Sequence, residues 1–411
     1  MNDEVATPSR LLAQISEIGR DPDRGGYTRP VFSRPERELT EWFVRQAEAR
    51  DLSVEVDGNG IVWAWWDAPG GVRADAVGTG SHLDSVPGGG AYDGPLGVMS
   101  ALSAVDHLRA RGVQPVRPLV VMVFPEEEGS RFGLACLGSR LASGLADPVR
   151  VRRLKDADGM TYAEASRAVG VDPDLIGPDP AGVGRLREFV ELHVEQGKGL
   201  ADLDQPVAIG RSILGHGRWR IVIEGRGDHA GTTRMADRQD PMVVAGEVIG
   251  IVRRAVLDVD EARGTVGRIR AVPGGTNVIA SRVEMWLDVR HFDDEQTRAI
   301  VKAISDAAAV SAERESCSFS ITQESFSPTV HFDETLRHRI ERVLPDAPVL
   351  DTGAGHDAGV LSTMLPSAML YVRNMTGTSH SPLEHCADAD ADAGAVALAD
   401  VLQDLVQKEA R

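Results

Sequence analysis

Apolar residues recur along the chain with two spacings, one typical of helices and one typical of strands. The stretch from Leu11 to Arg50 has helical spacing, and one face of it holds Leu39, Trp42, Phe43 and Ala47. Leu52 to Trp66 then alternates as a pair of strands does. A strand, a helix and a second strand follow at Val77–Leu83, Leu96–Arg111 with Gly112 behind it, and Leu119–Phe124. Strands separated by helices predict a largely parallel sheet.

A different order of elements begins near Arg211 and continues to about Gln323. It runs strand, helix, strand, strand, helix, strand, which is the order of a ferredoxin-like α+β domain. The six segments are Arg218–Glu224, Pro241–Val256, Thr265–Ala271, Arg282–Arg290, Glu295–Glu313 and Ser318–Thr322. The α/β pattern then returns, with a strand at Ala368–Val372 and a helix at Ala393–Val406. We therefore expect an α/β domain made of residues 1–210 and 328–411, with a second domain inserted at 211–327.

Composition and charge exclude several classes of protein. The net charge of -18 over 411 residues opposes nonspecific binding to nucleic acid or to an anionic membrane. An acidic surface does not attract an anionic substrate either, so local arginines or bound cations must recognise any substrate carboxylate. Cys136, Cys317 and Cys386 form no CxxC pair, which argues against a disulfide framework and a thiolate zinc site. No apolar run or leader suggests a membrane span or export, and we expect a cytoplasmic protein.

Histidine and carboxylate side chains stand where the predicted strands end. His82 lies at the end of one strand, a glycine-rich loop leads from it to Asp93, and Glu126-Glu127-Glu128 follows the next strand directly. Ligand-bearing loops of a parallel sheet gather at the carboxyl ends of its strands, so these residues should lie together. Asp84 could hydrogen-bond the ring nitrogen of His82 that a metal ion leaves free.

The charges of this group call for a cation. Three adjacent glutamates at a buried strand end repel one another unless one binds a metal ion and another holds a proton part of the time. Further histidines occur in Glu191–Gly197 and Gly377–His385. A lone histidine or a run of glutamates is usually structural or solvated, so the inference rests on the combination. Mixed carboxylate and imidazole ligands suit Zn or Mn, with Co or Ni as further options.

Seven ordered motifs give the chain a close resemblance to the amidase, hydantoinase and carbamoylase branch of the M20 metallopeptidase superfamily, from about Gly78 to Val406. They are SHLDSVPGGGAYDGPLGV, EEEGSRFG, ELHVEQG, HAGTTRM, GTNVIASRVEMWLDVR, GAGHDAG and GTSHSPLEH. The resemblance implies two divalent metal ions and a general base, Glu127, that takes a proton from water and returns it to the leaving nitrogen. It assigns His82 and His193 to one metal ion, Glu128 and His380 to the other, and Asp93 to both.

The resemblance also implies a homodimer in which the inserted domain serves for dimerisation and as a lid. That domain would supply His229, Asn277 and Arg290 to an active site, either its own or the partner's. Arg290 would grip the substrate carboxylate, Asn277 would orient it, and His229 would stabilise the oxyanion. Gln196 and His356 are further candidates for the substrate pocket.

The predicted activity is hydrolysis of the ureido or carbamoyl C–N bond of a small carboxylate substrate, with release of ammonia and carbon dioxide. His193 favours this branch, because related peptidases usually have a carboxylate there. The segments Gly217–Arg220, Thr232–Arg234 and Arg373–Gly377 favour allantoate, although many carbamoylases have Pro in place of Arg234.

Several alternatives stay open. N-carbamoyl-L-amino acid hydrolase and β-ureidopropionase are alternatives within the branch, and an M20 peptidase or aminoacylase lies outside it. A non-catalytic binding protein that keeps the fold is the alternative from a different class.

The family pattern also predicts a non-proline cis peptide between Asp93 and Gly94.

Overall fold

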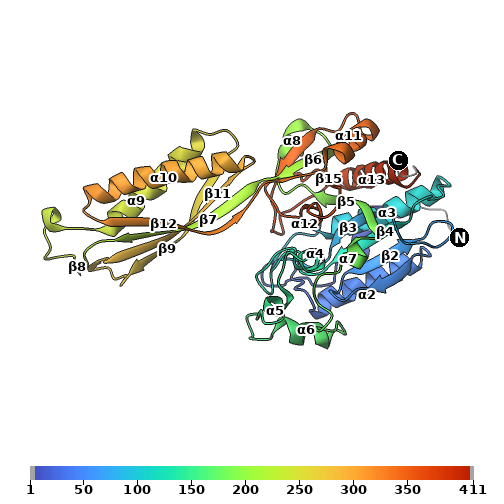
Figure 1. Cartoon of the computed structure of the whole chain (residues 1–411), viewed down its shortest axis with the longest axis horizontal. Coiled ribbons are helices and arrows are strands. Elements are labelled where there is room, and N and C mark those ends of the chain that lie inside the picture. The colour runs from blue at the N-terminus through green and yellow to red at the C-terminus, as the bar shows by residue number, and fades with distance from the viewer. Residues whose placement is uncertain (1–4, 408–411) are drawn as a thin grey trace. The chain divides into compact units, whose positions relative to one another are not determined.

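The structure is a computed structural model that describes residues 5–407. These residues divide into two compact units (Figure 1). The first unit contains the residues up to Arg211 and those from His331 onwards, and the second contains Ser212–Val330. Each unit has a hydrophobic core of its own. No helix among the described residues is long and apolar enough to cross a membrane.

A central sheet organises the first unit. Among the described residues it contains nine strands in the order β1-β2-β4-β3-β5-β15-β6-β13, with β14 beside β6. Their bounds are β1 (Ser53–Val56), β2 (Val62–Trp66), β3 (Ala76–His82), β4 (Leu119–Phe124), β5 (Leu186–Val194), β6 (Val207–Ile213), β13 (Val330–His331), β14 (Val349–Thr352) and β15 (Ser367–Val372). The neighbours β4, β3, β5 and β15 run parallel, whereas β1, β2 and β6 are antiparallel to their neighbours. The predicted mixed sheet with a largely parallel centre is confirmed.

Helices pack around this sheet. They are α1 (Pro8–Gln14), α2 (Arg34–Glu48), α3 (Pro95–Ala110), α4 (Leu137–Ala142), α5 (Pro148–Val151), α6 (Tyr162–Ala168), α7 (Pro180–Val183), α8 (Gly199–Leu203), α11 (Glu334–Val343), α12 (Asp357–Leu361) and α13 (Asp388–Val406). The predicted apolar face of α2 is buried. The helical pattern from Leu11 to Arg50 does not form one helix, because the chain turns at Gly19, Gly25 and Gly26, which have positive φ angles.

The second unit is a four-stranded antiparallel sheet with two long helices on one face. Its strands lie in the order β12-β7-β11-β9, so the predicted chain order folds into a ferredoxin-like arrangement. The bounds are β7 (Gly215–Glu224), β9 (Arg263–Val272), β11 (Arg282–His291), β12 (Ser318–Ser327), α9 (Pro241–Leu257) and α10 (Asp294–Arg314). A short pair, β8 (Asp228–His229) and β10 (Val278–Ile279), and the 3₁₀ helix η1 (Met235–Asp237) complete it.

Candidate metal centre

The parallel strands bring the predicted ligands to one edge of the sheet. His82 is the last residue of β3, Glu127 and Glu128 follow β4, and His193 lies near the end of β5. Asp93 stands just before α3, and His380 lies in the loop after β15. Because β4, β3, β5 and β15 are consecutive neighbours, residues far apart in sequence meet at their carboxyl ends.

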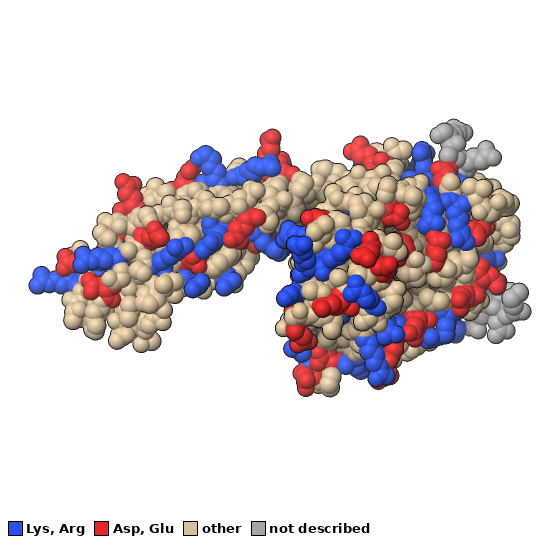
Figure 2. Space-filling model, turned by 60° about the horizontal axis from the view of Figure 1, so that its bottom comes forward, with Lys and Arg blue, Asp and Glu red and all other residues tan. Residues whose placement is uncertain are grey.

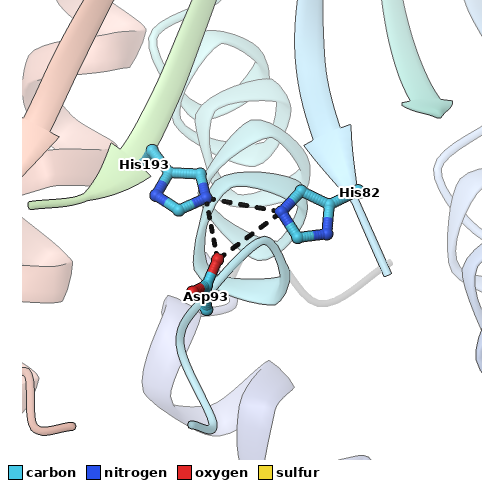
Figure 3. Close-up of side chains that lie close together, drawn as sticks. All are labelled: His82, Asp93 and His193. Atoms are coloured by element: carbon cyan, nitrogen blue, oxygen red, sulfur yellow. Dashed lines mark hydrogen bonds and ion pairs between the residues drawn. The ribbon is translucent and has the colours of Figure 1, made fainter. Parts of the chain in front are cut away.

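His82, Asp93 and His193 form a buried triad (Figure 3). The Nε2 atoms of the two histidines are 3.5 Å apart, and Asp93 Oδ1 lies 3.6 Å from His82 Nε2 and 3.3 Å from His193 Nε2. Ligand atoms about 2.1 Å from a tetrahedral metal ion are about 3.4 Å from one another. The three edges of the triad therefore match the spacing of ligands around one cation.

A second triad shares Asp93 with the first and adds Glu128 and His380. His380 Nε2 lies 3.2 Å from Glu128 Oε2 and 3.6 Å from Asp93 Oδ2. Asp93 thus turns one carboxylate oxygen to each triad, as a bridging ligand must. Glu128 Oε1 is buried without a hydrogen-bond partner among the described residues, which leaves it available to a cation.

Backbone carbonyls set the orientation of both buried imidazoles. His82 Nδ1 lies 3.0 Å from the Asp84 carbonyl oxygen, and His193 Nδ1 lies 2.8 Å from the Val194 carbonyl oxygen. Each Nδ1 therefore carries the proton and donates it, which leaves Nε2 as the ligand atom. The backbone amide of Gly94 donates a hydrogen bond to the same Nε2 atom of His193, with 3.2 Å between the two nitrogen atoms.

Asp84 has the position expected of it beside His82, and it also holds the segment after β4. Its carboxylate lies 3.5 Å from His82 Nδ1, farther than its own carbonyl. The two carboxylate oxygens accept hydrogen bonds from the amides of Glu127 and Glu128, each at 3.2 Å. Asp84 therefore connects the first triad to the segment that carries Glu127 and the second triad.

The prediction of a cis peptide between Asp93 and Gly94 is wrong. Val272–Pro273 is the one cis peptide bond among residues 5–407. The chain reverses direction instead through the dihedral angles of Gly94, φ +83° and ψ -60°, which favour glycine. A Cβ atom at Gly94 would overlap His82 Cε1, so the approach of the loop to the first triad also requires glycine.

The pKa shifts of the residues in the two triads show that their surroundings favour positive charge. Burial alone would lower the pKa of His82, but Glu127, Asp84 and Asp93 together raise that pKa well above 6.5. The pKa of His380 rises to about 9, chiefly because of its hydrogen bond to Glu128. Burial would raise the pKa of Asp93, and the two histidines of the first triad hold it well below 3.8. Bound cations would take over the role that these protons have, so spacing, free ligand atoms and charge all fit two divalent metal ions.

Glu127 lies beside the first triad. Its Oε2 lies 3.6 Å from His82 Nε2, and its Oε1 accepts a hydrogen bond from the Cys136 thiol at 3.2 Å. Burial raises the pKa of Glu127 well above 4.5, although His82 opposes the shift. Burial thus favours the protonated form of Glu127 relative to an exposed glutamate, and its role as general base stays a prediction.

The other residues predicted for the substrate pocket have different surroundings. Gln196 Nε2 donates to Asp93 Oδ2 at 3.2 Å, and its carbonyl oxygen accepts from Ser379. His356 is 3% exposed, and its ring packs against His193 with the ring centroids 4.6 Å apart. Contact of Gln196 and His356 with a substrate stays a prediction.

The predicted residues of the second unit lie at two ends of its sheet. His229 pairs with Val278, and the Asn277 carbonyl accepts a hydrogen bond from the Ala230 amide, so these two predicted residues are neighbours. Arg290 is near the other end of β11, opposite His216, and its Nε donates to Asp288 at 2.8 Å. Within this unit the three side chains do not converge.

Sequence reasoning missed Glu384 and Cys136. Glu384 Oε1 accepts hydrogen bonds from the amides of Tyr92 at 2.9 Å and Asp93 at 3.0 Å, so it fixes the backbone of the shared ligand. Glu384 belongs to the motif GTSHSPLEH, which was the available signal. Cys136 offered no such signal. Its contact with Glu127 depends on its own left-handed backbone conformation (φ +52°), just before α4 begins. As predicted, all three cysteines are free.

Comparison with known proteins agrees with this geometry. The model of peptidase family M20/M25/M40 matches residues 78–404. An N-carbamoyl-L-amino acid amidohydrolase of Geobacillus stearothermophilus is 33% identical, over 97% of this chain and 98% of the relative. An allantoate amidohydrolase of Escherichia coli (strain K12) is 30% identical, over 96% of each. The crystal structure of an amidase of the hydantoinase/carbamoylase family from Burkholderia multivorans matches with a TM-score of 0.89 and 29% identity, over 99% of this chain and 100% of that one. The resemblance predicted from the motifs is confirmed, and the chain belongs to peptidase family M20/M25/M40, in which its relatives include amidohydrolases of linear C–N bonds.

Proposed function

We propose that the protein is a dinuclear metal-dependent amidohydrolase that cleaves the carbamoyl C–N bond of a small ureido acid. The observation that carries the proposal is the pair of ligand triads that share Asp93, with Glu127 beside them. His82 and His193 would hold one cation, Glu128 and His380 the other. Imidazole and carboxylate ligands favour Zn or Mn, with Co or Ni as further options.

The chain's own residues provide the proton transfers. The two cations would polarise the scissile carbonyl group and lower the pKa of the attacking water. Glu127 takes the proton from that water and passes it to the leaving nitrogen, so that the C–N bond breaks to release ammonia and, from a carbamoyl group, carbon dioxide. Asp84 supports this step, because its carboxylate accepts a hydrogen bond from the backbone amide of Glu127 and so holds that residue in place.

Residues of the second unit would complete the site from two copies of the chain. β11 has ten residues at about 3.4 Å each, so its two ends are roughly 30 Å apart. A small ureido acid cannot bridge Arg290 at one end and His229 with Asn277 at the other. We infer that Arg290 binds the substrate carboxylate in one site, while His229 and Asn277 of the same chain serve the other site of a homodimer.

The surface of the second unit offers a contact for such a dimer. Met242, Ile249 and Leu257 lie on one side of α9 with Gly246 between them, and they are 45%, 45% and 70% exposed. The neighbouring strand β9 is at the edge of the sheet, and its Ile269 is 43% exposed. An apolar helix face beside the open edge of a sheet favours contact with another chain.

Two kinds of substrate fit the proposed reaction: allantoate and N-carbamoyl-L-amino acids. The sequence motifs favour allantoate, whereas the relative from Geobacillus stearothermophilus is named for N-carbamoyl-L-amino acids. Both substrates carry a carboxylate for Arg290 and a ureido group for the metal centre.

The test is ammonia release from a panel of allantoate, N-carbamoyl-L-amino acids, β-ureidopropionate and a dipeptide, with Zn or Mn added. Metal analysis of the same samples should find two divalent ions per chain and fewer than one after Asp93→Ala. Hydrolysis of the dipeptide alone would contradict the ureido assignment. Failure to bind any divalent ion after reconstitution would contradict the metal centre and favour a non-catalytic binding protein.

A further inference from the structure

The second unit differs in charge from the rest of the protein. Residues 212–330 contain 15 Lys and Arg against 17 Asp and Glu, a net charge of -2 out of the total of -18. The remaining -16 belongs to the first unit. The basic residues of the second unit are also unevenly distributed, because many of them lie on the face of the sheet that α9 and α10 leave open.

That face is defined by the alternation of side chains along its strands. The residues Trp219, Ile221, Val283, Met285 and Leu287 point into the core beneath the helices. The alternate residues point to the opposite side. They include six arginines, which we name the arginine face: Arg218, Arg220, Arg268, Arg270, Arg282 and Arg290. Figure 2 shows basic side chains along this part of the molecule, on the left of the view.

Ion pairs on this face leave a surplus of positive charge. Glu284 is contacted by three arginines, with Arg282 at 2.8 Å, Arg270 at 3.8 Å and Arg220 also hydrogen-bonded to it. Asp288 is shared by Arg290 and Arg218. With Glu224, which lies 3.5 Å from Arg282, three carboxylates face six guanidinium groups. An ordinary ladder of cross-strand salt bridges would pair them one to one.

The surplus charge is accessible to solvent and surrounds an aromatic side chain. The side chains of Arg218 and Arg270 are 62% and 63% exposed. Trp286 lies in the middle of the face, with the Arg268 guanidinium 4.3 Å from its ring centroid. Arg268 and Trp286 are directly opposite each other on β9 and β11. Exposed guanidinium groups beside a partly exposed ring form a surface that attracts small planar anions such as carboxylates.

We propose that the arginine face attracts carboxylate substrates and concentrates them for the metal centre. This inference rests on the proposed function, which assigns the substrate carboxylate to Arg290, and Arg290 is the last residue of the same face. On a protein with a net charge of -18, an acidic substrate meets repulsion over most of the surface. A positive surface that ends at Arg290 would offset this repulsion beside the residue to which the proposed function assigns the substrate carboxylate.

The first experiment measures the local charge without any substrate. Trp42, Trp63, Trp65 and Trp219 are buried, so in a Trp66→Phe background Trp286 is the tryptophan that quenchers reach most readily. Iodide should quench its fluorescence more than neutral acrylamide does, and the ratio should fall in Arg268→Gln/Arg270→Gln. Equal ratios in both proteins would overturn the proposal. The ratio is independent of what the enzyme hydrolyses.

The second experiment measures the effect on turnover. Arg268 and Arg270 lie opposite Trp286 and Glu284, four and six residues from Arg290 along β11, or about 14 and 20 Å from it. Removing charges at these distances from an anion in water should reduce its local concentration about twofold at low ionic strength. We expect Arg268→Gln/Arg270→Gln to lower kcat/KM about twofold for a hydrolysed ureido acid in about 0.01 M salt, with kcat unchanged. The loss should disappear in about 1 M salt and be absent for the neutral amide of the same substrate.

A matched control separates this effect from a general loss of charge. Lys302→Gln/Arg314→Gln removes two exposed positive charges from α10, on the helical side of the same unit, and should leave kcat/KM unchanged. An equal loss in both double variants, or an equal loss for acid and amide, would refute the role of the arginine face. Failure of the wild-type protein to hydrolyse any ureido acid would instead contradict the proposed function, and the quenching ratio would still decide whether the face attracts anions.

Discussion

Replacement of Glu384 should show how strongly the metal centre depends on a residue that is not one of its proposed ligands. Glu384 is 5% exposed, and one of its oxygens accepts the hydrogen bonds of two successive backbone amides, those of Tyr92 and Asp93. Glu384→Ala would leave both amides without a partner. A buried polar group without its hydrogen bond costs about 1–3 kcal/mol, so with two such amides the free energy of unfolding should fall by about 2–6 kcal/mol. That is a large part of the 5–15 kcal/mol typical of a domain.

Glu384→Gln provides the matched comparison. Burial, and secondly Asp93, raise the pKa of Glu384 to about 7, so the carboxyl group is often protonated near neutral pH. The amide resembles the protonated acid and keeps an oxygen for both backbone donors, so we expect a loss below about 1 kcal/mol. Gly90→Ala gives a third variant, because a Cβ atom there would lie too close to the same oxygen of Glu384 and displace it.

The assay is denaturant unfolding of the metal-free protein, followed by metal analysis after reconstitution. Glu384→Ala and Gly90→Ala should lose stability and bind metal ions weakly, since the Asp93 backbone is no longer fixed. Between pH 4.5 and 7, wild-type stability should fall relative to Glu384→Gln, because the unfolded state ionises its carboxyl group first and so is favoured as pH rises. Equal stability and metal content for the Ala and Gln variants would refute the reasoning.

Four further predictions concern the centre and its substrate. Glu127→Gln should keep both metal ions but lower kcat about 10²–10⁴-fold, and near-normal turnover would exclude Glu127 as the base. Arg290→Ala should raise KM for the acidic substrate, and an unchanged KM would exclude it as the carboxylate ligand. Metal affinity, measured by competition with a chelator, should rise with pH up to about 9, because His380 must lose its proton to bind; a flat profile would contradict this. Removal of metal ions with a chelator should lower the unfolding temperature in wild type but not in Asp93→Ala.

The sequence predicted those elements whose apolar residues are continuous or alternate regularly. Leu119–Phe124 coincides with β4, and the prediction for β11 differs from the structure by one residue. The strand β5 was missed, because Glu188 and Glu191 interrupt its apolar pattern. Their partners are distant in sequence: Arg117 lies 2.7 Å from Glu188, and the Ser81 hydroxyl donates to Glu191 at 2.9 Å. Such long-range pairs make a polar residue compatible with a buried strand, and no local pattern reveals them.

The same limit applies to the candidate site. Strand ends and motifs placed the ligand residues at one edge of the sheet, and the structure brings them into two triads. The sharing of Asp93 between the triads depends on its two oxygens pointing apart, which follows from the turn at Gly94 and from Glu384. The Glu384 contact spans 291 residues of sequence, so it depends on the completed fold.

The surplus of acid at the centre explains why the fold needs so many fixed hydrogen bonds there. Burial raises the pKa of Glu126 and of Asp357 to about 8. Neither is a proposed ligand, yet each is held, Glu126 by the Phe132 amide at 2.7 Å and Asp357 by the Ser139 hydroxyl at 2.5 Å. Buried carboxyl groups destabilise a fold unless they are protonated, hydrogen-bonded or close to a cation. Because these outer acids hold protons, negative charge stays at Asp93, whose pKa lies well below 3.8, and the proposed cations would be drawn to the two triads that share it.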